Sequence, residues 1–267
     1  MTDFFDTADG CLRSGGWRRY HRLLRLADRL HELALVALGT RRRVRQRADA
    51  AAPQRILLAA VEVPERATAL RGVIGQLRRT RHHVEVATAP MGSCGKFENI
   101  NRAIAGRDLT GYDWLLVVDD DIEVAEGFVD RLVGEALHRR FKLAQPAHRY
   151  LSYATFTVTQ RHWATASRRT GFVEIGPVTL LHRDTFAELL PFPDLRWCWG
   201  LDVRWAAVAA ARGWKMGVVD AAPIRHLRPV AASYDGAAAR REAVAFLAAG
   251  PPAPPRREML RTLDSYL

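Results

Sequence analysis

Cysteine, lysine and long apolar runs are scarce in this 267-residue chain, and each scarcity excludes a class of protein. The 3 cysteines lie far apart, which excludes cysteine-only zinc sites and any disulfide framework beyond a single bridge. No apolar run approaches the ~18 residues of a membrane-spanning helix. The N-terminus also lacks the basic start of a signal peptide. We therefore expect a cytoplasmic protein in a reducing compartment.

Lysine contributes only Lys96, Lys142 and Lys215 to the 40 basic residues, so arginine carries the positive charge. With 29 acidic residues the formal net charge is +11. Such a balance is compatible with nucleic acid, anionic lipid or nucleotide substrates. We expect no nucleic-acid partner, because the charge gathers in the N-terminal arm and no recognition motif accompanies it.

The first 53 residues predict a basic helical arm followed by a linker. Apolar residues and arginines each recur there at helical spacing, at Leu23, Leu26, Leu30, Leu33 and Ala37, and at Arg18, Arg22, Arg25 and Arg29. The pattern predicts an amphipathic helix from Trp17 to Leu38. Two interpretations are open: the helix docks on the main domain or a partner, or it makes a peripheral contact with the inner face of a membrane. The arginine run at 41–47 predicts the linker.

The segment from residue 54 to 249 alternates strand and helix signals and predicts the main domain. We expect strands at 56–63, 83–89, 114–118, 143–146, 172–181 and 216–219. We expect helices at 64–79, 97–105 and 125–140. This alternation predicts an α/β fold with a mostly parallel twisted sheet flanked by helices. Residues 250–267 predict a proline-rich tail with a short helix.

Three adjacent acids, Asp119, Asp120 and Asp121, follow the apolar strand expected at 114–118. In an open α/β sheet, ligands bind beyond the carboxyl ends of the strands, so we expect the triplet at the ligand crevice. A divalent cation would relieve the repulsion among the carboxylates. Oxygen ligands suit Mg²⁺ or Mn²⁺, whose remaining positions can take a diphosphate. The alternative is a solvated acidic loop.

Other cofactor motifs fail when tested residue by residue. Gly95 and Lys96 do not form a Walker A loop, because Pro90 stands where the first glycine is needed and Phe97 replaces the serine or threonine. The chain also lacks a G-x-G-x-x-G after the first strand, a G-x-S-x-G elbow, and a His-x-Glu paired with Cys-x-x-Cys. Dinucleotide-binding, hydrolase and deaminase interpretations are therefore excluded.

The order of these elements resembles the GT-A-fold glycosyltransferases, most of all family 2. The resemblance rests on a strand-helix-strand unit, the run from Gly95 to Ala103, and an apolar strand that ends in Asp-x-Asp. In the second half, residues 172–175, 199–202 and 217–220, followed by His226, are also similar to an uncharacterised GT-A-like family of plants and bacteria. The resemblance covers residues 54–235 and implies a GT-A, or nucleotide-diphospho-sugar transferase, fold.

The resemblance also implies a role for each candidate residue. Asp119, Asp121 and His226 would hold the metal. Asp202, which follows a Trp-Gly turn, would deprotonate the acceptor hydroxyl. Donor or nucleotide binding is assigned to Glu62, Lys96, Asn101, Asp119, Asp120, Trp199 and Gly200, and the acceptor pocket to Glu174 and Trp197. The structural alternatives are a helix-terminal acid for Asp202, an ordinary histidine at 226, an ordinary strand carboxylate at 174 and core packing for the tryptophans.

The predicted function is a metal-dependent glycosyltransferase that moves a single sugar from a nucleotide-diphosphate donor to a hydroxyl acceptor, with inversion implied by the family resemblance. A UDP-sugar is expected in preference to a GDP-sugar, and the acceptor is expected to be a carbohydrate or a lipid-linked molecule. Processive synthesis is not expected, because the Gln-x-x-Arg-Trp element is missing. Two alternatives remain: a sugar nucleotidyltransferase, and an inactive GT-A-like binding module. The second is suggested by Thr88-Ala89-Pro90, where family 2 enzymes place a base-reading Asp.

Overall fold

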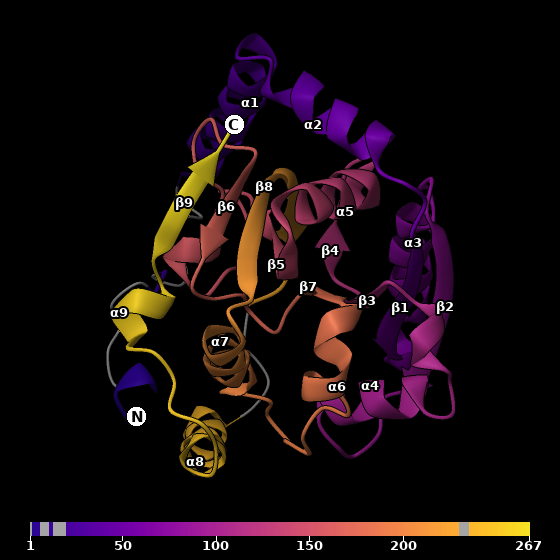
Figure 1. Ribbon diagram of the computed structural model, residues 1–267, viewed down its shortest axis with the longest axis vertical. Helices are drawn as coiled ribbons and strands as arrows, with labels where there is room; N and C mark the ends of the chain where they lie inside the picture. Colours follow the sequence, from indigo (N-terminus) through magenta and orange to yellow (C-terminus); the bar gives the residue numbers. More distant parts are fainter. Residues whose placement is uncertain (1, 6–10, 13–19, 230–234) are drawn as a thin grey trace.

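The computed structural model describes residues 2–5, 11–12, 20–229 and 235–267 of the chain. In these parts, nine strands form one sheet with helices on both faces (Figure 1). The strands are β1 (Arg55–Glu62), β2 (His83–Pro90), β3 (Trp114–Val118), β4 (Ile122–Glu123), β5 (Phe141–His148), β6 (Ser167–Thr170), β7 (Val178–His182), β8 (Lys215–His226) and β9 (Thr262–Tyr266). The α-helices are α1 (His21–Ala37), α2 (Thr40–Ala50), α3 (Ala67–Leu77), α4 (Lys96–Ile104), α5 (Phe128–Arg139), α6 (Phe186–Leu189), α7 (Leu201–Arg212), α8 (Gly236–Ala248) and α9 (Arg256–Met259). The 3₁₀ turns are η1 (Thr2–Phe5), η3 (Pro64–Arg66), η4 (Leu109–Gly111), η5 (Thr157–Thr159) and η6 (Arg183–Thr185).

The sheet is mixed, with strand order β2-β1-β3-β7-β5-β8-β6-β9 and β4 paired to β8. β1 lies parallel between β2 and β3, and β5 lies parallel to β8. β7 lies antiparallel between β3 and β5, and β6 is antiparallel to both β8 and β9. The α/β class and a sheet flanked by helices are confirmed, and the expected parallel pairing holds in part. β1, β2 and β3 are parallel neighbours, as are β5 and β8, whereas β4, β6, β7 and β9 make only antiparallel pairings.

Two apolar cores cover the two faces of the sheet. On one face, Leu57 and Leu115 pack with side chains of α4 and α7. On the other face, Ile56 and Trp114 pack with side chains of α3 and α5. Because alternate strand residues point to opposite faces and both faces are covered, β1 and β3 read as continuous apolar runs. Their carboxyl ends emerge side by side, since Ala60 is paired with Val118.

Several expected elements have different boundaries. The strand at 114–118 is confirmed as β3. The strand expected at 172–181 is wrong in its first half, because residues 171–177 form an irregular loop and β7 begins only at Val178. β8 continues well beyond the expected 216–219, as its burial persists to Ile224. The pattern missed β6 and β9, which are short strands of mixed composition at one edge of the sheet.

The linker expected at 41–47 is also wrong, because these residues belong to helix α2. Its buried residues, Thr40, Val44 and Ala48, recur every four positions and form one narrow face. That face packs on α5, where a Cβ on Gly134 would come within 2.8 Å of the Cα of Ala48. Arg47 donates to the buried carboxylate of Glu135 at 2.7 Å. A small-residue contact and an ion pair therefore hold a helix that carries few apolar side chains.

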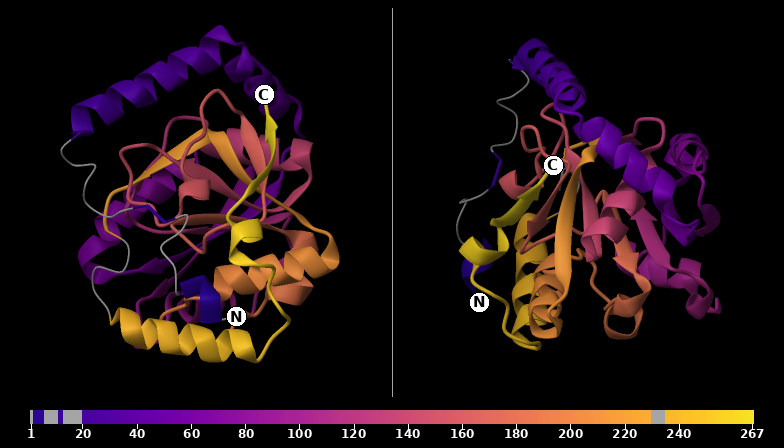
Figure 2. Two further views of the ribbon diagram at one scale, coloured as in Figure 1. Left: turned by 90° about the vertical axis from the view of Figure 1, so that its left-hand side faces the viewer. Right: turned by 45° about the horizontal axis from the view of Figure 1, so that its top comes forward.

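Helix α1 lies with α2 along one end of the molecule, outside the layers that cover the sheet (Figure 2). Trp17 and Arg18, where we expected the helix to begin, lie outside the described residues. The side chains of α1 that become buried are those of His31 and Leu35, whereas the predicted leucine stripe is exposed. Within the described ranges, no helix combines the length and apolar character needed to cross a membrane.

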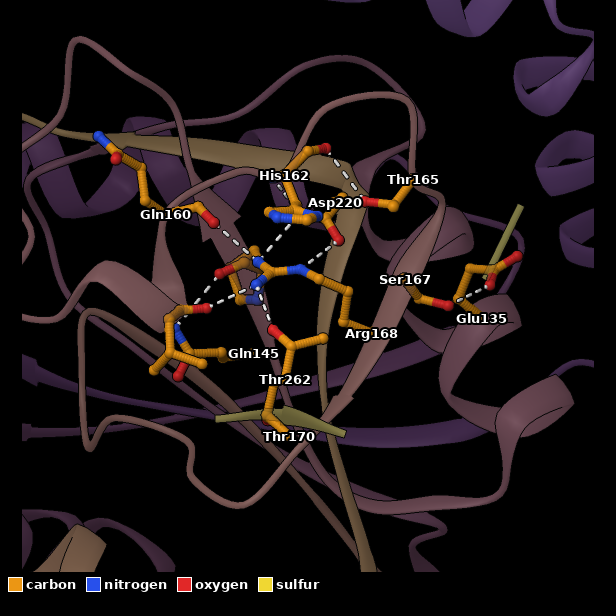
Figure 3. Close-up of polar contacts among 12 residues, drawn as sticks. Glu135, Gln145, Gln160, His162, Thr165, Ser167, Arg168, Thr170, Asp220 and Thr262 are labelled. Atoms are coloured by element: carbon orange, nitrogen blue, oxygen red, sulfur yellow. Dashed lines mark hydrogen bonds and ion pairs between the residues drawn. The ribbon is translucent and has the colours of Figure 1, made fainter. Parts of the chain in front are cut away.

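A buried ion pair joins β6 and β8 to the loop beside them (Figure 3). Arg168 and Asp220 are 1% and 0% exposed, and Arg168 Nε lies 2.9 Å from Asp220 Oδ2. Arg168 also donates to the carbonyls of Val158 and Gln160, and Asp220 accepts from the backbone N–H of His162. These bonds satisfy both charged groups, as buried charges require. They also fix the backbone of residues 158–162. In the chain, this segment comes shortly after residues 153–156, which line the candidate site described below.

Candidate active site

A cleft of about 760 Å³ opens at the carboxyl ends of β1 and β3. It brings together most residues that the sequence singled out: Lys96, Asp119, Asp120, Asp121, Glu174, Trp197, Trp199, Gly200, Asp202 and His226. Two candidates are not among its lining residues. Glu62 lies at the end of β1, and Asn101 exchanges two hydrogen bonds with the backbone of Phe192, at 2.7 and 2.9 Å. Asn101 therefore anchors the segment around Phe192, and its donor-binding role stays an untested prediction.

The three adjacent acids each face a different cationic side chain. Lys96 Nζ lies 2.6 Å from Asp119 Oδ1. Arg66 Nη1 lies 2.9 Å from Asp120 Oδ1. The third acid faces a histidine, as Asp121 Oδ2 lies 3.3 Å from His226 Nε2. The repulsion within the triplet is therefore relieved by charges from the start of α4, the turn η3 and the end of β8.

Lys96 and Arg66 hold their carboxylates in different surroundings. Gly176 leaves room for the first pair, since a Cβ there would lie 3.2 Å from Lys96 Nζ and 3.3 Å from Asp119 Oδ2. Asp120 is buried, and that burial raises its pKa above the ordinary value although Arg66 opposes the change. Its second oxygen, Oδ2, is buried without a hydrogen-bond partner. Asp120 as a residue lines the cleft and also a second pocket beside α3.

Backbone pairing places His226 beside Asp121. Ile122 of β4 pairs with His226 of β8, and the N–H of Leu227 donates to the carbonyl of Asp121 at 2.9 Å. Burial opposes ionisation of both side chains, but their mutual hydrogen bond and attraction outweigh it. The pKa of Asp121 therefore lies below its ordinary value, and the pKa of His226 lies above its own.

The Asp121–His226 pair has the orientation of a metal-binding pair. His226 Nδ1 lies 3.0 Å from the carbonyl oxygen of Tyr153, which can only accept, so Nδ1 carries a proton. The other nitrogen, Nε2, donates to Asp121 in this pair, and it becomes a metal ligand only where a cation displaces its proton. A metal-bound histidine commonly donates its second N–H to a carbonyl in this way. Asp121 and His226 are thus one carboxylate and one imidazole that could supply two ligands to a divalent cation.

A larger protein cage is not formed in the described part of the chain. There, no group of three or more His, Cys, Asp or Glu side chains is close enough to hold a metal ion. Asp119, which the resemblance assigned as a ligand, pairs with Lys96. All three cysteines are free thiols.

Asp202 lines the same cleft from the first turn of α7. Gly200 precedes the helix with φ +84°, a conformation that L side chains rarely adopt. The carboxylate accepts from the backbone N–H of Val203 at 2.9 Å and is 8% exposed. Burial, with the negative charge of Glu174, raises the pKa of Asp202 to about 7. A carboxyl group with this pKa can take a proton near neutral pH.

Glu174 has a neighbour that the sequence did not single out. His148, at the end of β5, places Nε2 3.4 Å from Glu174 Oε2, and its Nδ1 lies 2.9 Å from Ser152 Oγ. Both His148 Nε2 and Glu174 Oε2 are buried, line the cleft and lack a hydrogen-bond partner. The side chain of Gln145 accepts from the N–H of Glu174 and fixes the loop. A polar residue at the carboxyl end of a strand was the available signal for His148.

The two tryptophans precede Asp202 in the chain and line the same cleft. The backbone N–H of Trp197 donates to Glu242 of α8 at 2.8 Å, which ties this segment to the helix layer. The ring of Trp199 stacks on Phe5, with centroids 5.9 Å apart. Gly95 brings the start of α4 against the same segment, since a Cβ there would lie 1.8 Å from the carbonyl oxygen of Leu195. The start of α4 is thus in backbone contact with the segment that leads to the two tryptophans.

Comparisons with known proteins find only remote structural likeness. No protein-family model and no curated protein sequence matches the chain. The glycosyltransferase GalNAc-T7, solved with UDP, GalNAc and Mn²⁺, is similar at 13% identity over 68% of this chain and 45% of its own, with a TM-score of 0.45. A mycobacterial protein is similar at 16% identity over 76% of this chain and 77% of its own, with a TM-score of 0.49. A197 from STIV is similar at 10% identity over 66% and 86%, with a TM-score of 0.42.

All three TM-scores are below 0.5, so these likenesses carry no argument about the function of this chain. The chain also spans less than half the length of the GalNAc-T7 chain. A functional conclusion has to rest on the cleft itself.

Proposed function

We propose that this protein is a GT-A-fold, metal-dependent glycosyltransferase that moves one sugar from a nucleotide-diphosphate donor to a hydroxyl acceptor. The observation that carries the proposal is that one cleft is lined by residues suited to two kinds of chemistry. One part of the lining, which we call the first wall, comprises cationic side chains and the Asp121–His226 pair. The other part, which we call the second wall, comprises Asp202, with a pKa of about 7, and Glu174. Sugar transfer requires this combination, because a diphosphate must leave while a hydroxyl loses its proton.

The first wall would bind the donor. Asp121 and His226 would hold Mn²⁺ or Mg²⁺, which when bound stabilises the negative charge of the departing diphosphate. Lys96 and Arg66 would add positive charge beside the same phosphates. The unpartnered Oδ2 of Asp120 would accept a hydrogen bond from the nucleoside part of a UDP-sugar.

The second wall would bind and activate the acceptor. Asp202 would take the proton of the attacking hydroxyl, and direct displacement would invert the anomeric carbon. Glu174 and His148, whose Oε2 and Nε2 atoms lie 3.4 Å apart, both line the cleft and would hold neighbouring acceptor hydroxyls. Trp197 would offer a ring face to a sugar. We propose a carbohydrate or a lipid-linked carbohydrate as acceptor, with residues 54–249 as the catalytic domain of a cytoplasmic protein.

Two observations favour a second candidate, an inactive GT-A-like binding module. The described residues form no metal cage, and Thr88-Ala89-Pro90 lacks the acid that would read the nucleobase. Such a module would bind a nucleotide but would release no sugar from it. Measurement of donor cleavage therefore separates the two candidates.

The donor site is tested by the thermal stability of the protein with UDP or GDP, with and without Mn²⁺. A ligand at about 100 times its Kd adds about 2.7 kcal/mol to the stability. In a chain of this size that shift corresponds to roughly 5 °C in Tm. We expect a UDP shift that grows with Mn²⁺, because the metal and the diphosphate would share ligands. In the Asp121→Asn variant, Mn²⁺ should no longer increase the Tm shift caused by UDP.

The matched control is Glu126→Gln, which removes an exposed carboxylate shortly after the triplet. It should keep the full response to UDP and Mn²⁺. An equal UDP shift after exhaustive chelation, or in Asp121→Asn with an unchanged melting curve of the free protein, would contradict the proposed metal site.

A further inference from the structure

Helix α1 presents an apolar stripe to solvent. Of the 12 large apolar side chains that are exposed in the described chain, seven lie within 19 residues: Tyr20, Leu23, Leu26, Leu30, Leu33, Val36 and Leu38. The leucines at 23, 26, 30 and 33 are 48–64% exposed. They follow one another by three or four positions, so they form a single stripe along the helix. A contiguous apolar patch on a protein surface usually marks an interaction site.

The opposite face of α1 holds the helix on the domain. Asp28 and Glu32 both pair with the buried Arg161, at 3.2 and 2.6 Å. Between them His31 is fully buried, and its ring packs edge-on to Trp163 with centroids 5.3 Å apart. A helix that completes a core buries its apolar face. Helix α1 instead docks by a mixed face, on which Leu35 and His31 are buried beside the two acids, and it directs the leucines of the stripe outward.

The charge beside the stripe identifies the partner. Arg22, Arg25 and Arg29 are exposed and recur along the helix next to the leucines. The two acids of α1 are already paired with Arg161, so these arginines are not neutralised by them. A second copy packed on this stripe would bring like charges into one interface. An anionic phospholipid surface offers both an apolar boundary for the leucines and phosphates for the arginines.

We propose that α1 docks this protein on anionic membranes, with its leucine stripe in the headgroup boundary and its arginines on lipid phosphates. In the chain, the segment that holds α1 comes shortly after a segment that lines the cleft. Helix α1 rests on Arg161 and Trp163, and residues 153–156, shortly before them, line the cleft. This arrangement would suit a lipid-linked acceptor, but the membrane contact itself does not depend on sugar transfer.

The test is co-sedimentation of the full chain with phosphatidylcholine vesicles, with and without phosphatidylglycerol. We expect binding that requires phosphatidylglycerol and weakens as salt is added. Each arginine near an anionic surface contributes about fivefold, so replacing three with Gln should weaken binding on the order of 100-fold. The variants are Arg22→Gln, Arg25→Gln and Arg29→Gln combined. The control carries Arg71→Gln, Arg78→Gln and Arg79→Gln, which remove the same charge. All three arginines are exposed, the first within α3 and the other two directly after it.

A second variant, with Leu26→Ser, Leu30→Ser and Leu33→Ser, should lose binding even at low salt. All three side chains are exposed, so the melting temperature should not fall. Equal binding to pure phosphatidylcholine, or no binding of the intact chain at low salt, would overturn the proposal. It would also be overturned if the intact chain is a dimer that the leucine variant converts to a monomer, because the stripe would then face a second copy. Asp202→Asn should bind vesicles like the wild type, so a failure of the transfer proposal would show separately.

Discussion

Replacement of Asp202 by Asn should stabilise the folded protein at neutral and alkaline pH but not at acidic pH. The carboxyl group is 8% exposed, lies near the negative charge of Glu174 and has a pKa of about 7. In the unfolded chain the same group has its ordinary pKa of 3.8. The folded state therefore favours the protonated form, and ionisation of Asp202 costs folding free energy.

The sign and size of the effect follow from the two pKa values. Because the folded pKa is the higher one, the contribution of Asp202 is fully present below about pH 4 and is lost as the pH rises through about 7. The difference between 3.8 and about 7 corresponds to about 4 kcal/mol. Asparagine is neutral at every pH, and its side-chain oxygen can still accept from the N–H of Val203. At about pH 8 the variant should therefore gain up to about 4 kcal/mol, or roughly 8 °C in Tm.

The assay is thermal or urea unfolding of wild type and Asp202→Asn between about pH 4 and pH 8. The control is Asp194→Asn, an exposed acid of the preceding segment, whose stability should follow the wild type at every pH. The stability gap for Asp202→Asn should be near zero at the acidic end and widen steadily. A gap that is independent of pH, or a variant no more stable than the control at about pH 8, would refute the buried, electrostatically strained state of this carboxylate.

Two further predictions concern catalysis and the buried ion pair. The rate of sugar transfer by the wild type should rise with pH through about 7, as Asp202 loses its proton. In a donor-cleavage assay, Asp202→Asn should be about 10² to 10⁴ times slower than the wild type while it still binds nucleotide. A variant that keeps more than a tenth of the rate would rule out Asp202 as the base. Arg168→Met should cost about 3–5 kcal/mol in unfolding experiments, since Asp220 would be left charged and buried, and Asp220→Asn added to it should recover part of the loss. The 0–1% exposure of the two residues implies that the pair is desolvated. A loss of stability below about 1 kcal/mol would contradict that conclusion.

Local patterns were sufficient for the first half of the main domain. The apolar run at 114–118 predicted β3 residue for residue, because a strand buried on both faces leaves a continuous signal. The acids after it were correctly expected at the carboxyl end of the strand, and the leucine and arginine periodicity correctly indicated an amphipathic helix around 21–37. In each case the signal lies within a few consecutive residues, where side-chain spacing and strand termination act directly.

Contacts between distant residues were decided only by the tertiary structure. The sequence could not show that Asp119 meets Lys96 or that Glu174 meets His148, since these pairs come from separate loops and strands. Nor could it assign 41–47 to a helix, because α2 is held by its fit against Gly134 of α5. The direction of the leucine stripe was equally hidden, as it depends on Arg161, more than a hundred residues away. Amphipathic periodicity determines which side chains share a face, whereas the partner of that face is determined by the packing of the whole chain.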